Sequence, residues 1–303
     1  MRLSTLVLPF VLAACSRVPP GDEGDTDTNV IVDHGDTDEQ TEDTADSAVD
    51  TDTEVVDDTD VGPVGCAGGA GTVTTITDIR DGMGGFSTGD LVAVCAVVVT
   101  AVRDDKGFTV QDAGAISYGG IYVYQGLGGV VPAVGDLVDI VGVYEEFDGS
   151  GPDGAPLSST AQLFVDRNWS TPQHPDSSVL VVGTGTLPTP VDVTASTLAS
   201  SASAEPFESM LVTLTAGCPL SVSTDPSAAG SFYEFDVTAD AGMSTAVVDG
   251  EYYFLGDGYA SLAIGDSFST ITGPLFFSYG EYKVAPRSAA DATGYAAGGA
   301  GCP

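Results

Sequence analysis

A repeated pattern of short β-strands constrains the fold of this chain more than any other feature. From residue 72 onward, Val, Ile, Thr, Tyr and Phe cluster in short runs that Gly, Asp and Pro interrupt. No stretch shows the sustained 3.6-residue apolar period of an amphipathic helix. We therefore expect an all-β fold, and the roughly 240 residues after the N-terminal region suffice for two small domains.

The first copy of the pattern begins with a long run of β-forming residues at 89–102. A run of this length can bend from one sheet layer into another. Shorter strands are expected at 108–112 and 120–124, and a second long strand at 137–147. A closing strand at 161–165 completes a set of five.

The second copy repeats this order of long and short strands. The five corresponding segments are 207–214, 232–238, 244–248, 264–273 and 280–287. A Gly-Asp step precedes the fourth strand of both copies, and a Pro-stiffened connector at 187–191 joins them. We place the first unit at 63–175 and the second at 176–303.

The motifs of the two copies resemble a known family. GDLVAVCAVVVTAV, GFTVQDAG, GGIYVYQG and VGDLVDIVGVYEEFDG, with FESMLVTLTAG and YGEYKVAPRSAAD in the second copy, resemble the OB-fold modules of secreted bacterial nucleases and related surface proteins. The resemblance spans 72–293. It implies two tandem five-stranded Greek-key barrels, a fold in which strands two and three and the flanking loops often bind oligonucleotides or sugars.

The catalytic activity of those nucleases is not expected here. Their metal-dependent catalytic domain follows the OB-fold modules, whereas this chain ends at Pro303. Its two histidines, His34 and His174, lie in polar segments, and a phosphodiesterase site needs His, Asn and carboxylates around a cation. We therefore expect a protein that is not an enzyme.

The first fifteen residues have the order of a secretory signal peptide. Arg2 precedes an apolar run, and Leu-Ala-Ala leads into Cys15. This tetrad resembles the lipobox of bacterial lipoproteins, which implies removal of residues 1–14 and lipid attachment at Cys15. The expected location is the cell envelope, with the membrane as a partner through the lipid, at the outer membrane or cell surface. The alternative is an ordinary secreted protein with a chance cysteine.

An acidic segment follows the expected cleavage site. Seventeen of the 44 acidic residues lie between Asp22 and Asp60, with no Lys, Arg or aromatic residue among them. Such a segment cannot bury enough apolar area to offset its ordering entropy, and its like charges extend it. Residues 15–62 are therefore predicted to form a disordered tether.

The charge of the remaining chain bears on its partners. From Gly62 onward, 27 acidic residues face six basic ones, which gives a net charge of −21. Such a charge repels phosphate backbones, so nucleic acid is a disfavoured partner. Of the two function classes that remain, the charge favours a tethered module for a protein or glycan over an accessory nucleic-acid-binding protein.

The cysteines predict disulfides in the folded part. With Cys15 assigned to lipid, an even number remains in an oxidising compartment. These four are Cys66, Cys95, Cys218 and Cys302. They allow three pairings, of which chain proximity favours Cys66–Cys95 and Cys218–Cys302.

Aromatic residues of the first unit are the candidate ligand contacts. Tyr122 and Tyr124 share one face of a strand because side chains alternate along it, and Phe108 lies on the strand before. Stacking of the tyrosines on sugar rings or bases is one interpretation. The other, which we favour, is packing of the tyrosines on the barrel exterior, against loops or the second unit. A similar cluster occurs at 252–254.

The remaining candidates are polar or lie in the connector. The loop containing Asp148 and Asp153 combines carboxylates with glycine turns, which suits calcium, although a plain surface loop is the favoured interpretation. No other cofactor is expected. Arg287, which precedes Asp291, is predicted to form a structural ion pair or a C-terminal clasp, and Trp169 to be buried between the two units.

Overall fold

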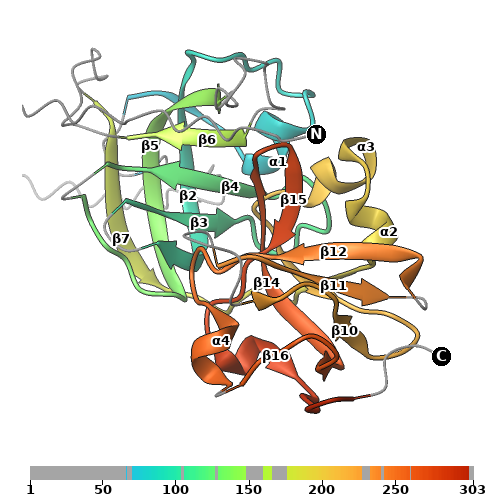
Figure 1. Cartoon of the computed structure of the whole chain (residues 1–303). Coiled ribbons are helices and arrows are strands. Elements are labelled where there is room, and N and C mark those ends of the chain that lie inside the picture. Colours follow the sequence, from blue (N-terminus) through green and yellow to red (C-terminus); the bar gives the residue numbers. More distant parts are fainter. Residues whose placement is uncertain are drawn as a thin grey trace, which may run out of the picture. The chain divides into compact units, whose positions relative to one another are not determined.

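The structure is a computed structural model. It describes residues 66, 70–103, 106–126, 129–147, 160–165, 176–226, 233–239, 242–259 and 261–299. Within these ranges the chain consists mostly of strands in two sheets, with a few short helices (Figure 1). The same ranges contain no helix with the length and apolar character needed to cross a membrane.

Several predictions fall outside the described residues. They include the signal peptide, the lipid site at Cys15, the tether 15–62 and the predicted burial of Trp169. Asp148 and Asp153, the candidate calcium ligands in a loop for which a plain surface role was favoured, also lie outside them.

The first sheet closes into a five-stranded barrel. Its strands are β2 (Leu91–Arg103), β3 (Gly107–Gln111), β4 (Gly120–Tyr124), β5 (Asp136–Phe147) and β6 (Thr160–Phe164). They pair in the order β2-β3-β4-β6-β5, and β5 pairs again with β2. Only the β4–β6 pairing in this ring is parallel. This is the five-stranded barrel that the resemblance to OB-fold modules implied for the first unit.

Two irregularities in β2 allow this strand to pair with both β3 and β5 and so to close the barrel. The register with β5 shifts between Val94 and Val97, and the register with β3 shifts between Val99 and Ala101. At the first shift Ala96 has a φ of 49°, and its N–H donates to Oδ1 of Asp139 at 2.8 Å. Bulges of this kind bend a strand and sharpen its twist. The predicted bend of the long strand is confirmed.

Further elements extend the first sheet and its core. α1 (Ile76–Arg80) begins at Thr75, whose side chain accepts a hydrogen bond from the N–H of Asp78, and it buries two isoleucines in the barrel core. β1 (Thr72–Val73) pairs with β2, and β7 (Ser178–Thr184) pairs with β5. The first sheet therefore continues past the predicted boundary at residue 175, because β7 belongs to it.

The second sheet curls into a half-barrel. Its strands are β8 (Val191–Val193), β9 (Leu211–Leu214), β10 (Leu220–Val222), β11 (Phe235–Ala239), β12 (Ser244–Val248), β13 (Ser267–Phe268), β14 (Thr270–Ser278), β15 (Glu281–Val284) and β16 (Ala292–Thr293). The order is β13-β10-β11-β12-β15-β14-β9-β8, with β16 on β14. β12 and β15 are parallel, as β4 and β6 are in the first barrel.

The repeat predicted from the sequence is visible in this topology. β9 and β10 correspond to the first strand of the barrel, interrupted at 215–219, and β13 and β14 correspond to the fourth, interrupted at Ser269. These interruptions leave the second sheet a curled half-barrel rather than a continuous barrel. The all-β fold with two barrel-like units is confirmed.

Short helices fill the gaps around the second sheet. They are α2 (Ala195–Leu198), α3 (Ser201–Ala204), η1 (Glu205–Phe207), α4 (Leu255–Gly258) and η4 (Ala289–Asp291). α2 begins with a capping box between Thr194 and Thr197. Leu198 and Leu255 join the core that the inward side chains of the strands form.

The predicted disulfide of the first unit is present. Cys66 and Cys95 are bonded, with a Cα–Cα distance of 5.2 Å. Cys218 is also disulfide-bonded, and its expected partner Cys302 lies outside the described residues. The second pairing therefore stays a prediction.

Candidate functional site

The structure separates the three aromatic residues proposed as ligand contacts. Phe108 lies opposite Val123 in the β3–β4 register, and both are fully buried in the barrel core. Tyr122 lies opposite Thr109, and directly paired residues share a face of the sheet. The tyrosines therefore point away from the core, and a ligand could not reach Phe108 without displacing the core.

The outward face of β3 and β4 is covered by the second unit. Only 5% of Tyr122 is exposed. Beside it, Arg103 forms an ion pair with Glu251, which comes from the loop after β12. Burial raises the pKa of Tyr122, and the nearby Arg103 guanidinium opposes this rise. Tyr252, from the same loop as Glu251, has a buried hydroxyl group here, and burial likewise raises its pKa.

Backbone contacts continue this cover along the same face. The N–H of Leu211 donates to Oε1 of Gln111 at 2.9 Å. At Gly120, the first residue of β4, a Cβ atom would collide with the backbone of Ser209 and Met210. A glycine inside a strand can signal such a close approach of another backbone. Gly120 was therefore a signal for this junction that the sequence analysis did not use.

Tyr124 is the one proposed contact that stays half-buried at the edge of this face. Its ring stacks on Phe164 of β6, with the centroids 5.6 Å apart. The interpretation in which the tyrosines pack on the barrel exterior describes Tyr122 and Tyr124 as they lie in the structure. Because the second unit occupies the face, we call the outward side of β3 and β4 the covered face.

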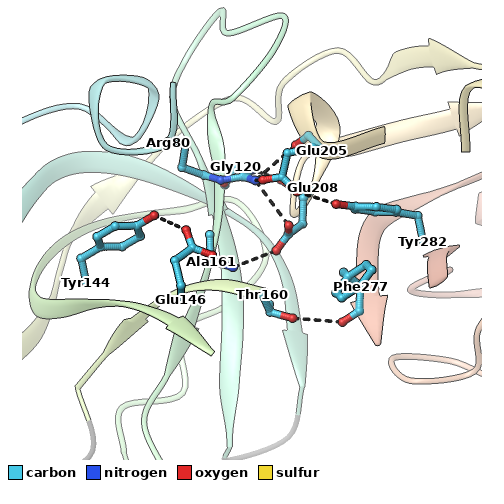
Figure 2. A network of polar contacts seen from close by, with 10 residues as sticks. All are labelled: Arg80, Gly120, Tyr144, Glu146, Thr160, Ala161, Glu205, Glu208, Phe277 and Tyr282. Atoms are coloured by element: carbon cyan, nitrogen blue, oxygen red, sulfur yellow. Dashed lines mark hydrogen bonds and ion pairs between the residues drawn. The ribbon is translucent and has the colours of Figure 1, made fainter. Parts of the chain in front are cut away.

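A buried polar network fastens the second unit beside the covered face (Figure 2). Arg80 lies at the end of α1, and its side chain is 1% exposed. Its guanidinium donates to the carbonyl oxygens of Gly120 at 3.1 Å and Glu208 at 2.7 Å. It also forms an ion pair with Glu205 at 2.7 Å and a longer one with Glu208 at 3.4 Å. One guanidinium thus binds groups from both units.

The carboxylates of this network have further partners. Oε1 of Glu208 accepts the N–H of Ala161 at 3.0 Å, and the hydroxyl of Tyr282 donates to Glu205 at 2.5 Å. Burial raises the pKa of Glu208, and the charge of Arg80 opposes this rise. The donors and acceptors of this network bind one another across the two units. Such an arrangement stabilises the junction between the units and is not typical of a reactive site.

A second set of polar contacts joins the two units near the C-terminal end of the described chain. Arg287 forms the predicted ion pair with Asp291 at 2.6 Å, so that prediction is confirmed. Nη1 of Arg287 also donates to the carbonyl oxygen of Thr100, in β2 of the first barrel, at 3.1 Å.

The second sheet has a counterpart of the covered face. In the first barrel Thr109, Tyr122 and Gln162 form a row across β3, β4 and β6. The corresponding row across β11, β12 and β15 is Asp236, Val247 and Lys283. We call the outward side of β11, β12 and β15 the second face.

A charged cluster lies at one end of the second face. Lys283 is 1% exposed, and its Nζ lies 2.5 Å from Glu234 and 4.0 Å from Asp249. Burial raises the pKa of Asp249 to about 7, although the nearby ammonium lowers it. The Nζ also lies 5.6 Å from the ring centroid of Tyr279, within cation–π range.

Two exposed tyrosines flank this cluster. Tyr233 is 52% exposed immediately before β11, and Tyr279 is 60% exposed in the turn between β14 and β15. The ring of Tyr233 lies 5.1 Å from that of Phe254. These two positions correspond to the loops that flank the ligand face of OB-folds. The sequence analysis did not single out either tyrosine, because it used Tyr233 only as part of an expected strand and Tyr279 only as part of the YGEYKVAPRSAAD motif.

A separate hollow lies on the first barrel. It has a volume of about 530 Å³ and is lined by α1, the Ala96 bulge and the turn after β3. Its most buried acid, Asp112, accepts the N–H of Thr77 at 2.9 Å and its hydroxyl at 3.0 Å. Burial raises the pKa of Asp112, which these hydrogen bonds oppose. The carboxylate of Asp112 thus stabilises the first turn of α1.

The described residues bring together one group with the spacing of metal ligands, Cys66, Cys95 and Asp139. Because the two sulfurs are joined in a disulfide, they are not available as thiolate ligands.

Comparison with known proteins gives no match for this chain, either among protein-family models or among curated proteins.

Proposed function

We propose that the protein is a non-enzymatic, envelope-anchored binding protein whose second face binds a protein or glycan partner. The main support for this proposal is that two corresponding faces differ in how exposed their tyrosines are. The covered face of the first barrel holds a buried tyrosine, whereas the second face has Tyr233 and Tyr279 more than half exposed at its rim.

The chemistry of the second face suits a polyhydroxylated or peptide ligand. Exposed tyrosine rings provide apolar area against a sugar ring or an aliphatic side chain, with a polar hydroxyl at the edge. Further hydrogen-bonding groups lie nearby. They come from Thr238 and Thr245, which pair across β11 and β12, and from the carboxylate of Asp236. A lipid on Cys15 and an extended acidic tether would present this face away from the membrane.

A glycan array probed with the full chain tests the proposal, alongside the double variant Tyr233→Ala, Tyr279→Ala. We expect binding by the wild type and at least a tenfold loss in the variant, with an unchanged melting temperature. Phe147→Ala is the matched control, because Phe147 is an aromatic residue with a similar exposure of 55% and lies at the end of β5 in the first barrel. Equal loss in the control would contradict this assignment of the site.

The accessory nucleic-acid role is the second candidate, since bases can also stack on exposed tyrosines at about 1–3 kcal/mol each. The net charge of −21 from Gly62 onward opposes it. Fluorescence anisotropy with single-stranded DNA in chelator, and again with calcium, separates the two candidates. We expect no binding in chelator at physiological salt. Micromolar affinity that weakens with added salt would place the nucleic-acid role first.

A further inference from the structure

The edge of the first sheet carries an apolar strand that the functions above do not use. β7 is the terminal strand of this sheet, and within the described part of the chain it pairs only with β5. Its central residues are exposed although apolar: Leu180 by 50%, Val181 by 42% and Val182 by 45%. A strand at a sheet edge offers main-chain N–H and C=O groups to another strand.

β7 has little of the protection usual at such an edge. Natural edges carry charged residues, proline or bulges that prevent pairing with another chain. Ser178–Thr184 contains no charged residue and no proline. The one irregularity in its pairing with β5 is a register shift at Val182, which can act as a protective bulge near the end of the strand. The pairing of Ser178–Val181 with β5 is regular.

The apolar surface continues beyond the strand. The N–H of Gly185 donates to the carbonyl oxygen of Gly135 at 2.8 Å, which joins the end of β7 to the loop before β5. That loop adds Val134, which is 45% exposed, and Leu187 follows β7 at 38%. Exposed apolar residues that gather around one sheet edge are typical of an interaction site.

The charge of the chain indicates which partner fits this edge. With a formal net charge of −36, two copies repel each other over most of their surfaces. β7 is neutral and therefore one of the places where two copies can meet without bringing carboxylates together. A strongly charged partner would find no complementary charge on this strand.

The strand is also complementary to itself. In an antiparallel pairing of two copies centred on Leu180, the two Leu180 side chains meet, and Val179 of each copy lies opposite Val181 of the other. Apolar cross-strand pairs of this kind stabilise a sheet. We propose that β7 is a homodimerisation edge, at which a second copy of this chain adds its own β7 and joins the two sheets across a two-fold axis.

Sedimentation of the full mature chain over a range of concentrations tests this proposal. We expect a reversible monomer–dimer equilibrium in the wild type. In Leu180→Lys, two ammonium groups would meet at the axis, so the dimer should weaken at least tenfold. Ile264→Lys is the matched control, because Ile264 is 62% exposed in the turn before β13 and should leave the equilibrium unchanged.

Cross-linking identifies the edge directly. Leu180→Cys should form a disulfide between two copies on a non-reducing gel, whereas Ile264→Cys should not. A wild type that stays monomeric at every concentration would overturn the proposal. So would open-ended oligomers, since a two-fold pairing closes at two, and so would equal weakening by both lysine variants.

Discussion

Arg80 donates a hydrogen bond to the carbonyl oxygen of Glu208 at 2.7 Å, although 128 positions separate them in the sequence. Both side chains are almost fully buried, so this contact between the first barrel and the second unit is made in a low-dielectric environment. The two units are therefore joined by buried polar groups as well as by apolar packing. Such a junction is stable only while each charged group keeps its partners.

Replacing Arg80 should test this dependence most directly. Arg80→Met keeps much of the apolar stem but leaves the carboxylate of Glu208 buried without its cation. Breaking a buried ion pair in this way costs about 3–5 kcal/mol. We expect a loss of that size in the free energy of unfolding, measured by urea denaturation.

The matched control for Arg80→Met is Lys106→Met, which removes a positive charge at an exposed turn. Lys106→Met should change stability by less than about 0.5 kcal/mol, as surface substitutions usually do. The structural role of Arg80 would be refuted by a similarly small effect of Arg80→Met.

The close contact at Gly120 leads to a second prediction. In Gly120→Val, the new side chain would collide with the backbone of Ser209 and Met210, which cannot move without disturbing the junction. Overpacking of this kind typically costs about 1–3 kcal/mol. Thermal unfolding should show the loss, and limited proteolysis should cut more readily between the units.

Gly217→Ala serves as the control for the glycine substitution, because a Cβ at that position meets no atom within 4 Å. Protease resistance in Gly120→Val equal to that of the wild type would show that the junction tolerates a side chain there.

The strand order was predictable because it rests on local patterns. The strand expected at 120–124 is β4 as observed, and the long strand at 89–102 corresponds to β2 within two residues at either end. Both contain β-branched runs bounded by turn residues, which a single sequence displays directly. β7 was not anticipated, because it lies at 178–184 beside a predicted connector and gains its register only from β5.

The sites were less predictable, because burial depends on contacts between distant segments. Alternation shows that Tyr122 and Tyr124 share a face, but it cannot show that residues more than 85 positions later cover that face. The pairing of Arg80 with Glu208 cannot be predicted from the sequence either, since a local pattern does not show which distant segments come into contact. Tyr233 and Tyr279 became candidates only once the topology of the two sheets could be compared strand by strand.

The disulfide of the first barrel provides a third prediction. Cys66 and Cys95 close a loop with a sequence separation of 29. Restricting the unfolded chain with such a loop contributes about 2–4 kcal/mol. The double variant Cys66→Ala, Cys95→Ala should lose this amount in urea denaturation while its far-ultraviolet circular dichroism stays native.

Reductant provides the control for the disulfide variant. Dithiothreitol should lower the stability of the wild type by at least as much as the double substitution does in its absence. The loss can be larger because Cys218 is also disulfide-bonded. A wild type that is indifferent to reductant would contradict a stabilising role for the Cys66–Cys95 bond.

The carboxyl group of Asp249 gives a fourth prediction, on pH. Burial raises its pKa from 3.8 to about 7, against the effect of Lys283, while Glu234 and Glu251 raise it further. The folded state therefore binds this proton more tightly than the unfolded state does. Stability from this group is complete below about pH 4 and is lost as the pH rises through about 7.

Asp249→Asn should remove this pH dependence, because the amide is neutral at every pH and its oxygen can still accept the N–H of Glu251. At pH 8 the variant should be more stable than the wild type by about 1–4 kcal/mol, with the upper value set by 1.36 kcal/mol per pKa unit. The difference should shrink steadily towards pH 5. Asp192→Asn, at an exposed position of β8, controls for the removal of one negative charge. Urea denaturation at each half pH unit measures the effect. Parallel stability curves for Asp249→Asn and the wild type between pH 5 and pH 8 would show that this carboxyl group titrates alike in both states.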